Sequence, residues 1–65
     1  MTPHDYTARR ANLVREYNFL LSKRLPRSAA ARVRKIAQLD YEYDGIDPEQ
    51  TKAIFRYSEL IRNRL

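Results

Sequence analysis

Pro26 interrupts an otherwise helical pattern and so constrains how the first half of the chain can fold. Proline cannot donate a backbone hydrogen bond, and it moves the residue before it, here Leu25, away from helical backbone angles. Ser28 is a favourable N-cap residue, and the three alanines that follow it are strong helix formers. We therefore expect one helix to end near Leu25 and a second to begin at Ser28.

The segment before Pro26 has the periodicity of an amphipathic helix, which we place at residues 3–25. Thr2 is suited to the N-cap and Pro3 to the first helical position. Large apolar residues then recur at spacings of three, four and seven, as expected for one face of a helix. This predicted inner stripe consists of Tyr6, Leu13, Val14, Tyr17, Leu20 and Leu21.

Two more helices are predicted, at residues 28–43 and 47–64. Gly45 is the only glycine and fits a helix C-cap, and Asp47 followed by Pro48 is a strong helix start. The predicted inner stripes are Ala29, Ala30, Val33, Ile36, Ala37 and Tyr41 in the second helix, and Ala53, Ile54, Tyr57, Ile61 and Leu65 in the third.

Three helices with short connections fold most simply into a bundle, so we predict an all-α, compact three-helix bundle in which residues 1–65 form one domain. A helix-turn-helix-like arrangement and a dimer are open alternatives. A chain of this length buries only a small core, and it contains no cysteine. Helix packing, dimerisation or a partner must therefore stabilise the fold.

Charge is distributed unevenly along the chain. Residues 1–35 hold nine basic and two acidic residues, which is a net charge of +7. Residues 36–51 hold five acids and no base, whereas residues 52–65 hold four bases and one acid. Arginine predominates over lysine and favours planar, two-pronged contacts with phosphate or carboxylate. This asymmetry favours a polyanionic partner for one face of the protein.

The stretch from Lys23 to Lys35 contains six basic residues and no acid. Arginines around a helix N-terminus are unfavourable unless an anion binds there, because the helix dipole is already positive at that end. We therefore predict a nucleic-acid site, with DNA favoured over RNA because no exposed aromatic platform for single strands is evident. Its candidate residues are Lys23, Arg24, Arg27, Ser28, Arg32, Arg34, Lys35 and Gln38.

The predicted function is that of a small DNA-binding regulator of transcription or accessory factor. In this prediction the second helix is the element that reads the DNA sequence. The expected phosphate ligands are Arg27, Ser28 and Arg32, and the residues expected nearer a groove are Arg34, Lys35 and Gln38. The alternative is that the alanines pack against another helix while the arginines are only solvated.

A protein-binding adaptor or inhibitor is the second functional hypothesis. It uses the acidic tyrosine segment 40–44 together with large apolar residues outside the predicted stripes, because tyrosine and exposed apolar side chains are typical of interfaces. The candidate partner-binding residues are Asp40, Tyr41, Glu42, Tyr43, Phe19, Phe55 and Leu60. Leu39 also lies outside the stripes. The acids are alternatively paired within the chain, with Lys52 or Arg56, or with the basic stretch of a second copy.

Motifs for catalysis or metal binding are not evident in the sequence. His4 is the only histidine, and there is no phosphate-binding glycine loop. The spacing of Asp40, Glu42, Asp44 and Gly45 partly resembles an EF-hand calcium loop, but a threonine stands where that loop needs its bidentate glutamate. We predict no enzymatic activity, cofactor, metal, small-molecule substrate or membrane span, and a cytoplasmic location.

Overall fold

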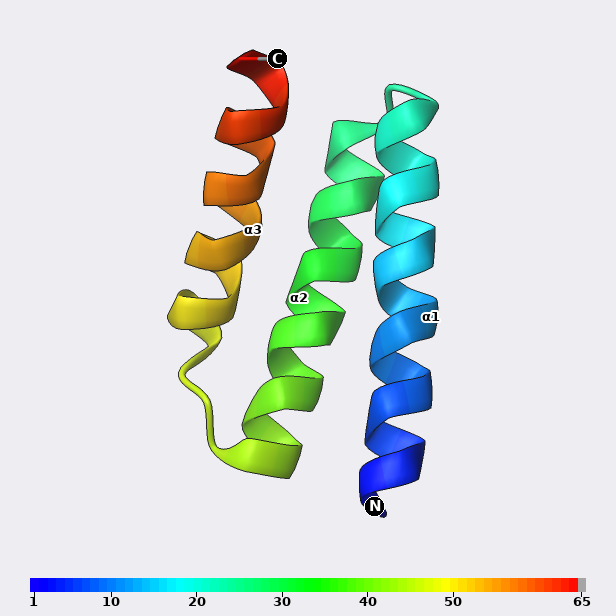
Figure 1. Ribbon diagram of the computed structural model, residues 1–65, viewed down its shortest axis with the longest axis vertical. Coiled ribbons are helices and arrows are strands. Elements are labelled where there is room, and N and C mark those ends of the chain that lie inside the picture. Colours follow the sequence, from blue (N-terminus) through cyan, green and yellow to red (C-terminus); the bar gives the residue numbers. More distant parts are fainter. Residues whose placement is uncertain (65) are drawn as a thin grey trace.

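The computed structural model describes the backbone of residues 1–64, which forms three helices (Figure 1). They are α1 (Pro3–Ser22), α2 (Pro26–Asp44) and α3 (Pro48–Arg64). Consecutive helices run in opposite directions, and α2 lies between the other two in a body of 35 × 20 × 19 Å. The predicted all-α three-helix bundle is confirmed. Leu65, the last member of the predicted third stripe, lies outside the described residues.

The connection between α1 and α2 does not form a helix-turn-helix. That motif sets its two helices at about 90–120°, whereas α1 and α2 lie side by side along their lengths (Figure 1). The connection spans only Lys23, Arg24 and Leu25. With so short a connection α1 and α2 pack as an antiparallel hairpin, which is not the arrangement expected of a helix-turn-helix at this junction.

The start of α2 also differs from the prediction, because Pro26 begins the helix and Ser28 does not cap it. Leu25 occupies the N-cap position without any capping side-chain hydrogen bond. Proline suits the first helical position, where its missing N–H is not needed and its backbone angle is already helical. Arg27 and Ser28 therefore lie in the first turn of α2, two residues further into the helix than expected.

The other predicted caps are present. Thr2 Oγ1 accepts a 3.1 Å hydrogen bond from the backbone N–H of Asp5, and Asp47 Oδ1 accepts one of 3.0 Å from Glu49 N–H. Gly45 adopts a left-handed conformation with φ of 68°, which glycine enters without a steric penalty. These caps fix the start of α1, the end of α2 and the start of α3 close to the predicted positions.

The buried apolar residues come only from α1 and α2 among the described residues. They are Tyr17, Ala29, Val33, Ile36, Ala37 and Leu39. The predicted stripe of α1 is confirmed, because every member is buried or half-buried. The predicted stripe of α2 needs three corrections: Ala30 and Tyr41 are exposed, whereas Leu39 is buried.

The predicted inner face of α3 is wrong. Ala53, Ile54, Tyr57 and Ile61 are exposed, and Thr51 and Phe55 face α1 and α2 instead. The Thr51 hydroxyl donates a 3.0 Å hydrogen bond to a buried carboxylate on α2, and this polar contact orients the helix. An apolar stripe identifies one face of a helix, but here it is not the face that packs.

Candidate nucleic-acid interface

Five of the predicted DNA-binding bases are exposed, and all of them lie on α2 or in the connection before it. Arg27, Arg34 and Lys35 project from the outward side of α2, and Lys23 and Arg24 lie in the connection that leads into it. None of the five forms an ion pair within residues 1–63. Their charges are therefore available to a partner. We call this set, Lys23, Arg24, Arg27, Arg34 and Lys35, the basic face.

Other predicted members of the site have partners within the chain. Arg32 is half-buried, and its Nε lies 2.9 Å from a carboxylate oxygen of Glu16 on α1, without the alignment of a hydrogen bond. Gln38 is exposed, but its side-chain amide donates a 2.9 Å hydrogen bond to Glu42. The assignment of Arg32 as a phosphate ligand is therefore corrected: its guanidinium ties α2 to α1.

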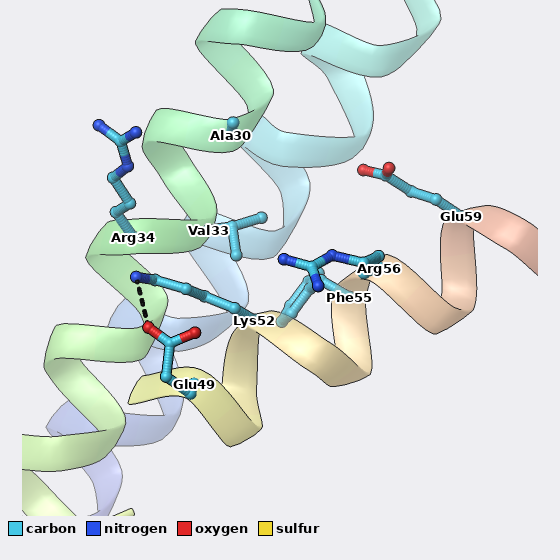
Figure 2. Close-up of a pocket in the computed structure, with 8 residues that line it drawn as sticks. All are labelled: Ala30, Val33, Arg34, Glu49, Lys52, Phe55, Arg56 and Glu59. Atoms are coloured by element: carbon cyan, nitrogen blue, oxygen red, sulfur yellow. Dashed lines mark hydrogen bonds and ion pairs between the residues drawn. The ribbon is translucent and has the colours of Figure 1, made fainter. Parts of the chain in front are cut away.

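Two of the shallow grooves beside α2 include basic-face residues in their lining. The first, of about 370 Å³, lies between α2 and α3 and has Val33 and Phe55 among its lining residues (Figure 2). Lys52 and Arg56 reach into it from α3, while Arg34 extends outward from its rim. The second, of about 390 Å³, lies between α1 and α2 and is lined by residues that include Arg9, Asn12, Lys35 and Gln38.

The groove between α2 and α3 contains acids as well as bases. Lys52 Nζ lies 3.2 Å from Glu49 Oε1, so its charge is largely compensated. Arg56 is exposed and forms no ion pair in the described part of the chain. The groove therefore carries the bases Arg34 and Arg56 together with the acids Glu49 and Glu59.

Arg24 connects α1 to α2 in an unusual backbone conformation. Its φ of 59° is the only positive value among the non-glycine residues that the structure describes. The Leu25 N–H then donates a 3.0 Å hydrogen bond to the carbonyl of Leu20, which closes α1. Lys23 stands beside Arg24 with its ammonium 5.6 Å from the ring centre of Phe19, so the tight turn holds two cationic side chains at one end of the bundle.

Charge is separated along the long axis of the bundle. Because neighbouring helices are antiparallel, the end of α1, the start of α2 and the end of α3 meet at one extremity (Figure 1). The exposed bases at this basic end are Lys23, Arg24, Arg27 and Arg62, and the exposed acids at the opposite, acidic end are Asp5, Glu42, Asp44, Asp47 and Glu49. A polyanion is therefore attracted to one end and repelled by the other.

Asp40, predicted to bind a partner, is instead buried, with only 2% of its surface exposed. Its carboxylate accepts hydrogen bonds from Tyr6 Oη at 2.7 Å, from Arg10 Nε at 3.0 Å and from Thr51 Oγ1 at 3.0 Å. These donors come from α1 and α3, so the carboxylate joins all three helices. The sequence signal that the prediction missed is the position of Asp40 four residues after the buried Ile36. This spacing places the two side chains on the same face of α2.

The surroundings of Asp40 determine its ionisation. Burial by itself raises the pKa of the carboxyl group, but hydrogen bonds from Arg10, Tyr6 and Thr51 and the charge of Arg10 outweigh it. The net result is an Asp40 pKa below its ordinary value. Burial and the neighbouring carboxylate raise the pKa of the Tyr6 phenol, so it remains a donor. Asp40 is therefore held as a carboxylate in an ion pair with Arg10.

The other predicted partner-binding residues have different environments. Tyr43 is half-buried and its ring stacks on that of Tyr6, with centroids 4.2 Å apart. Phe55 is half-buried against the edge of Tyr17, with centroids 5.0 Å apart, so its assignment to an exposed surface is corrected. The members that are exposed are Tyr41, Glu42, Phe19 and Leu60. Their assignment to a protein partner remains a prediction.

Long side chains join α1 to α3, whose backbones do not approach closely. The Tyr17 hydroxyl donates a 2.6 Å hydrogen bond to Glu59, and Arg62 donates one of 3.3 Å to the side chain of Asn18. Burial and the contact with Glu59 raise the pKa of Tyr17. Polar side chains therefore supply part of the attachment of α3 to α1.

Among the described side chains, no three His, Asp or Glu residues are grouped as metal ligands. Within residues 1–64, no helix has the length and apolar character of a membrane span.

Comparison of the chain with models of protein families, with curated proteins and with solved structures finds no match.

Proposed function

We propose that this chain is a small nucleic-acid-binding protein, a DNA-binding regulator or accessory factor whose basic face contacts the phosphate backbone. The observation that carries the proposal is the exposure of five bases, none of them ion-paired within residues 1–63, on α2 and the connection before it. Exposed bases of this kind release counterions when they bind phosphates, which is the main source of affinity for duplex DNA.

The first turn of α2 supports a phosphate contact. No side chain caps this turn, and it contains no acid. Its free backbone N–H groups and the positive end of the helix dipole favour an anion. Arg27 lies in the same turn and Arg24 in the connection before it. A phosphate here would satisfy groups that the fold leaves without a partner.

The outward side of α2 supports a contact along the helix. Arg34 and Lys35 lie two turns after Arg27 on the same exposed side, with the small side chains of Ala30 and Ala31 between them. Small residues let a phosphate backbone approach the helix closely. Gln38 follows one turn later, and its amide can exchange its bond with Glu42 for one with a base edge.

The charge separation of the bundle favours one orientation on DNA. The basic end approaches the phosphates, and the acidic end, with Asp44, Asp47 and Glu49, points away from them. In this mode the acidic end has no role in binding DNA. Phosphate contacts of this kind give affinity and orientation, while sequence preference depends on the few side chains that reach base edges.

Fluorescence anisotropy with a labelled random-sequence duplex tests this function. Arg34→Gln is expected to weaken binding about fivefold, because one charged contact with phosphate is lost. Arg15→Gln is the matched control: it removes another exposed helical arginine that the basic face does not include. Equal affinities of the two variants, or no binding by the unmodified chain, would contradict the proposal.

A further inference from the structure

Among the described residues, four exposed large apolar side chains lie on α3. With the exposed Ala53 they form a set, Ala53, Ile54, Tyr57, Leu60 and Ile61, which we call the apolar stripe. The four large members are between 46% and 66% exposed. Spacings of three and four residues place all five on one side of the helix, with no charged residue at these positions.

Little apolar surface of α3 is buried within the chain. Phe55 is its only large apolar side chain that turns toward α1 and α2, and even this ring is only half-buried. Thr51 is the only fully buried residue of the described part of α3. A domain of 65 residues has a small core and gains stability by burying further apolar surface in an assembly. The apolar stripe is suited to burial in such an assembly.

We propose that the apolar stripe pairs with the same stripe of a second copy, in an antiparallel arrangement with two-fold symmetry. In such an interface, residue i of one copy contacts residue j of the other, and residue j of the first copy contacts residue i of the second. Centring the pair on Tyr57 places Ile54 opposite Leu60 of the second copy and Ala53 opposite Ile61. Every member of the stripe then has an apolar residue opposite it.

Charge complementarity selects a second copy in this orientation. α3 begins at the acidic end, beside the exposed Asp47 and Glu49, and its last turns carry the exposed Arg62. Antiparallel pairing brings the acidic end of each copy beside the basic end of the other, whereas parallel pairing juxtaposes like charges. Complementary ends of this kind favour the correct partner and disfavour the wrong register. This inference does not depend on DNA binding.

Sedimentation velocity in the absence of nucleic acid tests the pairing. The unmodified chain is expected to sediment with twice its mass of 7.8 kDa at concentrations above about 100 μM. Tyr57→Glu is expected to weaken self-association about 100-fold, because it sets two carboxylates against each other at the centre of the interface. Tyr41→Glu, at an exposed tyrosine of α2, is the matched control and is expected to leave the dimer intact.

Single cysteines test the orientation, since the chain contains none of its own. A mixture of Ile54→Cys and Leu60→Cys chains is expected to form a disulfide-linked dimer under mild oxidation. Either variant alone should link poorly, because identical positions are displaced by about 9 Å along an antiparallel pair. A monomer at about 0.5 mM, equal effects of the two tyrosine substitutions, or efficient linking of Ile54→Cys to itself would overturn the proposal. Circular dichroism confirms in each case that the variant remains helical.

Discussion

Tyr6 and Asp40 are 34 positions apart in the chain, and the Tyr6 hydroxyl donates a 2.7 Å hydrogen bond to the Asp40 carboxylate. The same carboxylate accepts from Arg10 on α1 and from Thr51 on α3. One buried acid thus connects the start of α1, the end of α2 and the start of α3.

Asp40→Asn should destabilise the fold by about 2–3 kcal/mol. The substitution keeps the shape of the side chain but removes the charge that balances Arg10, and breaking a buried ion pair is costly. Urea denaturation followed by circular dichroism measures the change. Asp44→Asn is the control, since Asp44 is exposed at the end of the same helix. If the two substitutions had equal effects, the buried network would not be stabilising.

Acid should destabilise the protein through Asp40. Because the folded-state pKa of this carboxyl lies below its unfolded value of about 4, its stabilising contribution is complete above that pH. The contribution is lost as pH falls from about 4 toward the folded-state pKa. Urea denaturation between about pH 7 and pH 2 should show a smaller acid-induced loss for Asp40→Asn than for the unmodified chain. Parallel pH profiles of the two proteins would contradict this assignment.

Arg24→Gly should stabilise the protein by about 0.5–1 kcal/mol. Arg24 adopts a left-handed backbone conformation that costs a non-glycine residue about 1 kcal/mol or more, and glycine removes that cost while adding freedom to the unfolded chain. The melting temperature should rise. Lys23→Gly is the control and should lower it, because the φ of Lys23 is an ordinary −89°. A fall in melting temperature for both variants would show that Arg24 is not strained.

Asp47→Ala should destabilise the protein by about 1 kcal/mol. Asp47 caps α3 through its 3.0 Å hydrogen bond with the backbone N–H of Glu49, and alanine leaves that donor without an acceptor. Thermal denaturation measures the loss. Asp47→Ser restores an acceptor and should recover most of the stability. An unchanged melting temperature for the alanine variant would mean that the cap contributes nothing.

The sequence was sufficient to predict the number of helices, because each begins or ends at residues with strong local preferences, such as Pro48 and Gly45. It also identified the inner face of α1, whose apolar stripe is continuous. The face of α3 was predicted incorrectly because its most apolar side does not pack within the chain. What orients α3 is the bond between Thr51 and Asp40, and a contact between distant positions leaves no local pattern in the sequence.

Only part of the candidate site could be predicted from the sequence. The exposure of a side chain depends on its position within a helix, whereas its pairing depends on the tertiary fold. Exposure of Arg27, Arg34 and Lys35 follows from their positions opposite the buried side of α2. The pairing of Arg32 with Glu16 depends on how α1 and α2 lie against each other, which no spacing within either helix reveals. Whether an arginine is available to a partner is therefore decided by the tertiary fold.

The salt dependence of duplex binding tests the nucleic-acid proposal most directly. Each phosphate contact contributes about 0.9 to the slope of log affinity against log salt, so the basic face predicts a slope steeper than about −3. Replacing both Arg27 and Arg34 with Gln should flatten it by about 1.8, whereas Arg32→Gln should leave it unchanged, because that arginine is paired with Glu16. A slope near zero, or equal slopes for all three proteins, would contradict the account.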